Sequence, residues 1–138
     1  MMIRSRPRQS GVALLEALIA TVILAIGLLG AVGLQARAYS ALADADVRAE
    51  ATIATDKLLG VMANDAANLS NYALTSTGTP SPTLKPWIDE TNSYIPGAST
   101  TITLTPQGGY TKVSVVIQWI RKAGPRSITN QHQITAYL

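Results

Sequence analysis

An almost unbroken apolar run from Val12 to Leu34 limits what this chain can fold into more than any other feature of its sequence. Only Glu16 and Thr21 are polar in this run. As an α-helix the run would be about 34 Å long, which is enough to cross a bilayer core of roughly 30 Å with some tilt. The sequence therefore predicts one membrane-length helix close to the N-terminus.

A short basic segment precedes the apolar run. It contains Arg4, Arg6 and Arg8 and no acid, so the N-terminus should stay in the cytoplasm while the rest of the chain is exported. The run is longer than the ~7–15 apolar residues of a secretory signal, and no A-x-A-like cleavage site closes it. These features favour a helix that is retained after export, and a simple membrane anchor is one alternative.

The carboxylate of Glu16 is the most unusual group in the run. An acid within a membrane helix is costly unless it has a cationic partner, although one near the helix end could also reach the lipid headgroups. Cleavage after Gly11 would give Val12 a free amine, one helical turn before the acid. The amine of one subunit could then pair with Glu16 of its neighbour, so that a helix bundle buries matched charges and fixes its register.

The segment from Gly11 to Glu16, which reads GVALLE, resembles the class III signal of type IV pilins and pseudopilins. Its continuation to Gln35 looks most like the PilV family of minor pilins, and the resemblance is weak beyond that residue. Two positions depart from the family pattern. Val12 stands where Phe is common, and Ala13 stands where Thr or Ser is common.

This resemblance implies a processing pathway and a set of partners. Gly11 would be the last leader residue, removed by a prepilin peptidase that also methylates the new amine of Val12. Glu16 would be the assembly carboxylate. The expected partners are other minor pilins, the major pilin, the peptidase and the inner membrane. The chain would come from a Gram-negative bacterium, with its C-terminal domain in the periplasm before assembly and in the pilus or its tip afterwards.

The basic charge of the chain belongs to its leader. The whole sequence has 11 basic and 8 acidic residues, a net charge of +3. Without Arg4, Arg6 and Arg8 the counts become 8 and 8, so the remaining chain is neutral. No nucleic acid partner is expected, because such binding requires a basic surface. The sequence has no cysteine, so no disulfide can stabilise the exported part.

Beyond the apolar run, the sequence predicts a continuing helix and then a loop. Helical periodicity without proline extends to about residue 68, which predicts one helix over 12–68 with an amphipathic second half. Residues 69–98 are rich in Thr, Ser and Pro and predict a long surface loop. Trp87 and Ile88 are expected to return from this loop to the core.

Alternating apolar residues then predict three antiparallel strands, at 99–105, 110–120 and 127–138, with turns at 106–109 and 122–125. The second strand places four apolar side chains on one face: Val113, Val115, Ile117 and Trp119. Only the amphipathic half of the long helix can cover that face.

The expected fold class is α+β, a pilin-like ladle in which the long helix packs against a three-stranded antiparallel sheet. Four parts are expected along the chain: a cleaved basic leader at 1–11, a transmembrane and assembly helix at 12–34, the amphipathic half of the helix at 35–68, and the loop and small sheet of the periplasmic globular domain at 69–138.

Few side chains could support catalysis. The one histidine, His132, is expected to be a half-buried strand residue, and no cysteine or second imidazole accompanies it as a metal ligand. Asp44, Asp46 and Glu50 are expected to be solvated surface acids near Arg48. No enzyme activity, catalytic residue, metal or cofactor is expected.

The leading interpretation is a minor pilin that takes part in pilus initiation, assembly or adhesion. One alternative is a minor pseudopilin of a type II secretion system, which would share the fold and the processing. Another is a membrane-anchored periplasmic binding module that never polymerises. This last alternative predicts that substitutions of Gly11 and Glu16 leave function intact.

Overall fold

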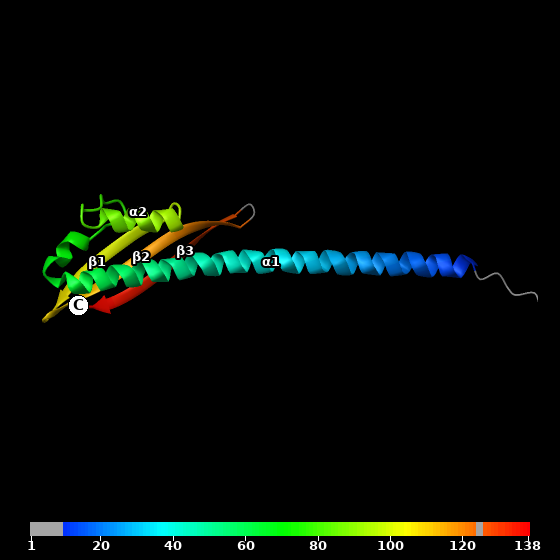
Figure 1. Ribbon diagram of the computed structural model, residues 1–138, viewed down its shortest axis with the longest axis horizontal. Helices are drawn as coiled ribbons and strands as arrows, with labels where there is room; N and C mark the ends of the chain where they lie inside the picture. The colour runs from blue at the N-terminus through cyan, green and yellow to red at the C-terminus, as the bar shows by residue number, and fades with distance from the viewer. Residues whose placement is uncertain (1–9, 124–125) are drawn as a thin grey trace, which may run out of the picture. The chain divides into compact units, whose positions relative to one another are not determined.

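The computed structural model describes residues 10–123 and 126–138, and its first element is the uninterrupted helix α1, Ser10–Asn64 (Figure 1). The sequence of this helix is rich in Ala and Leu and contains no proline, which suits a long helix. The prediction of one continuous N-terminal helix is confirmed. The helix ends four residues earlier than expected, because Asp65 leaves the helical conformation at φ −122° and ψ 41°.

The chain divides into two units between Ala43 and Asp44. In the first unit, every described side chain from Gly11 onward is exposed. Among the described residues, one helix is both long enough and apolar enough to cross a membrane, and this helix is α1. A helix that is apolar on all sides is typical of a membrane span or of a helix buried among others, and residues 12–34 of α1 have this character.

The second unit contains a three-stranded antiparallel sheet in the order β1-β2-β3 (Figure 1). Its strands are β1, Ser99–Gln107; β2, Tyr110–Ala123; and β3, Arg126–Tyr137. The predicted meander is confirmed, with longer strands than expected. The first turn is shorter than predicted, because Gly108 and Gly109 both have positive φ and close a two-residue hairpin. Of the second predicted turn, Gly124 and Pro125 lie outside the described residues.

The core of the second unit lies between the sheet and the C-terminal half of α1. The predicted apolar face of β2 is buried, with Val115 paired to Ile102 of β1 and to Ile134 of β3. From α1, Leu58 and Met62 are almost completely buried in the same cluster. Figure 1 shows this half of the helix crossing the sheet, as the sequence predicted.

The prediction that residues 69–98 form one long surface loop is wrong for part of this segment. It contains a second helix, α2, Lys85–Tyr94. Pro86 is expected from the sequence to break regular structure, but it stands in the first turn of α2, where its missing N–H costs nothing and its fixed φ suits the helix. Trp87 returns to the core as predicted, and its Nε1 donates a hydrogen bond to the carbonyl oxygen of Ala54, 2.8 Å away.

A 3₁₀ helix, η1, Ala66–Tyr72, connects α1 to the rest of the unit and ends on a buried tyrosine. The Tyr72 hydroxyl donates a hydrogen bond to Oδ2 of Asp65, 2.9 Å away. Burial raises the pKa of the Tyr72 phenol above its ordinary value of 10.0, and the hydrogen bond and negative charge of Asp65 raise it further. The folded state therefore favours the neutral phenol.

This raised pKa predicts a loss of stability in alkali. The contribution of Tyr72 is complete below about pH 10, where the unfolded phenol still holds its proton, and it disappears as the pH rises through the raised pKa. The unfolding free energy of the wild type should therefore fall more steeply above about pH 10 than that of Tyr72→Phe, as measured by denaturant titration at a series of pH values. Parallel slopes for the two proteins would contradict this role.

Candidate processing and assembly segment

The three predicted site residues lie together at the start of α1, in the first unit. Gly11 is the second residue of the helix, and the space around its α-carbon is open. Val12 follows it and is 70% exposed. Glu16 lies four residues further on, one helical turn beyond Val12, and this spacing places the two on the same face of the helix. The two residues that flank the candidate cleavage bond, Gly11 and Val12, are therefore both exposed.

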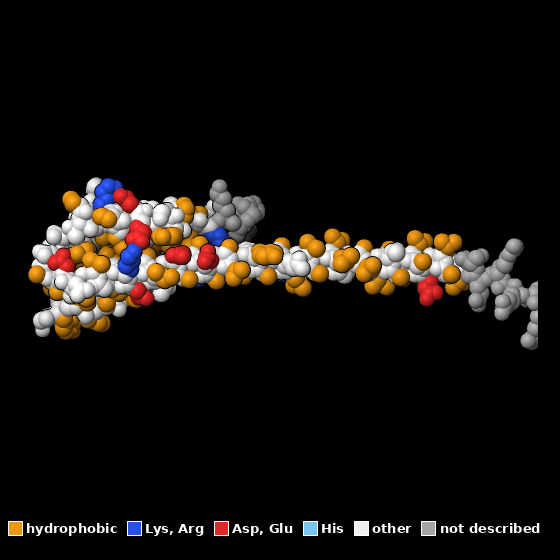
Figure 2. All heavy atoms as spheres, in the orientation of Figure 1, with side chains coloured by type: hydrophobic (Ala, Val, Ile, Leu, Met, Phe, Trp, Pro, Cys, Tyr) orange, Lys and Arg blue, Asp and Glu red, His pale blue; other side chains and the backbone are white. Residues whose placement is uncertain are grey.

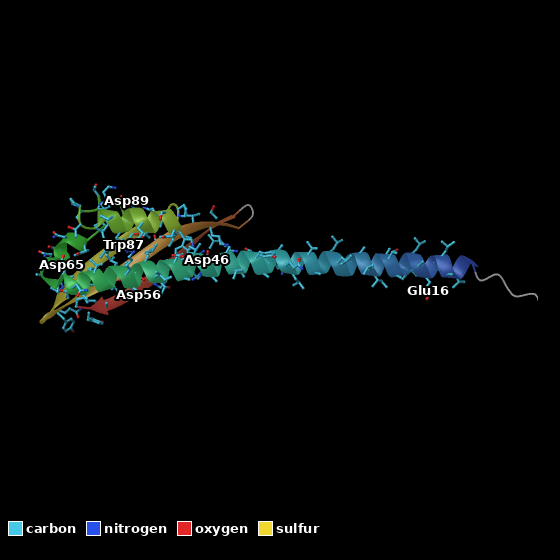
Figure 3. The ribbon with its side chains drawn as sticks, in the orientation of Figure 1. Glu16, Asp46, Asp56, Asp65, Trp87 and Asp89 are labelled. Atoms are coloured by element: carbon cyan, nitrogen blue, oxygen red, sulfur yellow. The ribbon has the colours of Figure 1, made fainter. Side chains whose placement is uncertain are left out.

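The Glu16 carboxylate stands in apolar surroundings. It lines a shallow hollow on the helix surface together with Val12, Ile19 and Ile23. Within residues 10–123 and 126–138 it has neither an ion pair nor a hydrogen bond, and Figure 3 shows it near the start of α1. A carboxylate in such a position is expensive to place in lipid without a cation.

Thr21, the second polar residue of the apolar run, finds its hydrogen-bond partner within its own helix. The Thr21 hydroxyl donates a hydrogen bond to the carbonyl oxygen of Leu18, 2.8 Å away. Such bonds to the preceding turn are a common way to accommodate a hydroxyl in an apolar helix. Thr21 therefore has a hydrogen-bond partner within its own helix, whereas Glu16 has none among the described residues.

The interpretation of Asp44 as a solvated surface acid is wrong. Its carboxylate is only 19% exposed and lies 3.3 Å from Nε of Arg48 and 3.6 Å from Nη1 of Arg121 on β2. It also accepts a hydrogen bond of 3.2 Å from Nδ2 of Asn130 on β3. Asp44 thus ties the helix to two strands. The nearby Asp46 remains an exposed surface acid, as predicted, whereas Glu50 is half-buried and not fully solvated.

His132 is half-buried in β3, as predicted. Its Nε2 lies 3.3 Å from the buried hydroxyl of Thr55, which donates its own proton to a backbone carbonyl of α1. This contact joins β3 to α1. The described residues hold no group of three or more side chains suited to a metal ion.

Residues 6–32 match the family model described as the prokaryotic N-terminal methylation motif. The match contains all three predicted site residues: Gly11, Val12 and Glu16. The proteins of this motif family are structural and not enzymatic. Neither the curated proteins nor the solved structures gave a significant match to the chain. By its N-terminal segment, the chain carries the methylation motif of prepilin-processed, type IV pilin-like proteins.

Proposed function

We propose that this chain is a minor pilin, an assembly subunit of the type IV pilus. In this proposal a prepilin peptidase cleaves after Gly11 and methylates the new amine of Val12. The observation that carries the proposal is the match of residues 6–32 to the methylation motif, on a part of α1 whose apolar side chains from Val12 to Leu34 are all exposed.

The pairing of Glu16 with an amine explains how the processed helix could join a bundle. Removing one partner of a buried ion pair costs about 3–5 kcal/mol, because the other charge is left buried without compensation. Cleavage supplies the missing cation one helical turn away from the acid. Since both charges sit on one side of the same helix, a neighbour displaced along the helix axis can place its amine against Glu16.

The proposed location changes during assembly. Before assembly, the Val12–Leu34 helix spans the inner membrane with the cytoplasm at its N-terminal end, in accord with the arginines of the leader. After assembly, the chain lies in the pilus or at its tip, beside the major pilin and other minor pilins, where it contributes to initiation or adhesion. The minor role rests on the PilV-like continuation of the signal from Ile23 to Gly30.

Fractionation of filaments sheared from the cell surface tests this proposal. The chain should be present in the sheared filaments at a small fraction of the major subunit, and it should disappear from them when the major subunit is deleted. If the chain is found only in the inner membrane of piliated cells, it is a non-polymerising anchor. If its loss impairs protein secretion and leaves piliation unchanged, it is a pseudopilin.

A further inference from the structure

A groove of about 210 Å³ lies between α1 and α2, within the second unit. Trp87 lies in it and is only 9% exposed, while Ile53 and Tyr94 line it and are each 60% exposed. Two carboxylates also line the groove: Glu50 from α1 and Glu90 from α2. Figure 3 shows Trp87 between the two helices. The groove therefore combines aromatic and apolar walls with acidic groups.

Two contacts between the helices form this groove. The indole N–H of Trp87 donates to the carbonyl oxygen of Ala54 over 2.8 Å. Nζ of Lys57 lies 2.6 Å from Oε1 of Glu90. Both contacts join α1 to α2 at the groove. The pair of Lys57 and Glu90 also shows that the groove accommodates a cationic side chain beside an acidic one.

The charges around the groove favour a further cation. Its lining contains two acids, Glu50 and Glu90, and one base, Lys57, so one acid is in excess. Glu50 is half-buried and has no ion pair or hydrogen bond among the described residues. Asp46 is exposed one helical turn before it. In Figure 2 acidic side chains lie over α1 and α2 on this face.

We propose that this groove binds an arginine side chain carried by another protein chain. A guanidinium can form two parallel hydrogen bonds to the Glu50 carboxylate and can stack on the rings of Trp87 and Tyr94. The exposed Ile53 would cover its methylene stem. The identification of the other chain as a pilus subunit rests on the proposed function, whereas the binding of arginine does not.

An NMR titration of the full-length chain in detergent micelles tests this assignment. The probe is N-acetyl-arginine amide, and the matched control is N-acetyl-citrulline amide, which has nearly the same shape without the charge. The indole N–H signal of Trp87 should shift progressively with the arginine compound and remain in place with the citrulline compound. The indole signal of Trp119, which lies in the core of the unit, should not move with either.

Two variants locate the binding group. Glu50→Gln should weaken binding of the arginine probe about tenfold, since it removes a charged hydrogen-bond partner. Asp89→Asn removes the same charge from α2, but Asp89 pairs with Lys85 and does not line the groove, so its binding should equal the wild type. An unchanged Trp119 signal shows that each variant is folded.

Three results would overturn the assignment. Equal shifts with the citrulline compound would show that the charge is not recognised. Equal losses in the Glu50 and Asp89 variants would show that only the general field of the protein attracts the probe. Equal affinity for N-acetyl-lysine amide would show a site for any cation. Each result concerns the groove itself and leaves the proposed role in the pilus untouched.

Discussion

Glu16→Ala is expected to leave the chain in the membrane but to remove it from sheared filaments, with a reduction of at least tenfold. In the substituted subunit, the amine of a neighbour would be buried without its anion. The cost of about 3–5 kcal/mol for such a broken pair corresponds to more than a hundredfold in an equilibrium constant, so tenfold is a conservative expectation. Quantitative immunoblotting of the filament and membrane fractions measures the effect.

Thr21→Ala is the matched control for this experiment. Thr21 lies in the same apolar run, and its hydroxyl is bonded to Leu18 of its own helix, so its loss removes a polar group without leaving any partner unpaired. Thr21→Ala should enter filaments at the wild-type level. Wild-type incorporation of Glu16→Ala would remove the role assigned to the carboxylate, because the helix would then assemble without its charge.

Leu58→Ala is expected to lower the unfolding free energy of the second unit by about 2–5 kcal/mol. Leu58 is only 1% exposed, in the cluster between α1 and the sheet, and its truncation would leave a cavity where these elements meet. Domains of this size are usually stable by about 5–15 kcal/mol, and this chain has no disulfide to compensate. Denaturant unfolding of the full chain in detergent, followed by tryptophan fluorescence, measures the loss.

The matched control is Leu42→Ala, the same substitution on an exposed position of the same helix. Leu42 is 67% exposed, so its truncation should change the unfolding free energy of the sheet unit by less than about 0.5 kcal/mol. If both leucine variants unfold at the wild-type midpoint, α1 does not stabilise the sheet through this cluster, and the core has been assigned to the wrong residues.

The parts of the fold that the sequence predicts correctly are mostly those with a regular spacing of apolar residues. The uninterrupted helical pattern led to α1, and the alternation of Val113, Val115, Ile117 and Trp119 correctly identified the buried face of β2. Both patterns are long, and each repeats with the period of one type of secondary structure. The apolar face of the sheet then required a cover, and α1 supplies it.

The helix α2 could not be predicted because its signals are short and contradictory. Its ten residues include Pro86. Proline is favourable in the first turn of a helix but interrupts a helix at interior positions, so its presence alone does not predict a helix. Its position also depends on contacts distant in the sequence, such as the bond from Trp87 to Ala54. The same reason explains the error at Asp44, whose partners Arg121 and Asn130 are more than 70 residues away.

The two candidate sites also differ in how far the sequence alone could identify them. Gly11, Val12 and Glu16 belong to one short motif, so the sequence alone could suggest all three together. The groove between α1 and α2 takes Glu50 from one helix and Trp87 from another, and the sequence does not predict α2. A site assembled from two distant segments leaves no local pattern in the sequence.

The mass of the protein purified from its native cells tests the central claim most directly. The account predicts a chain that begins at Val12, lacks Met1–Gly11 and carries one additional methyl group on its N-terminal amine. Gly11→Val should retain the full leader and serve as the unprocessed reference. An intact native chain that still begins at Met1 would contradict the account, because Glu16 would then have no newly formed amine to pair with.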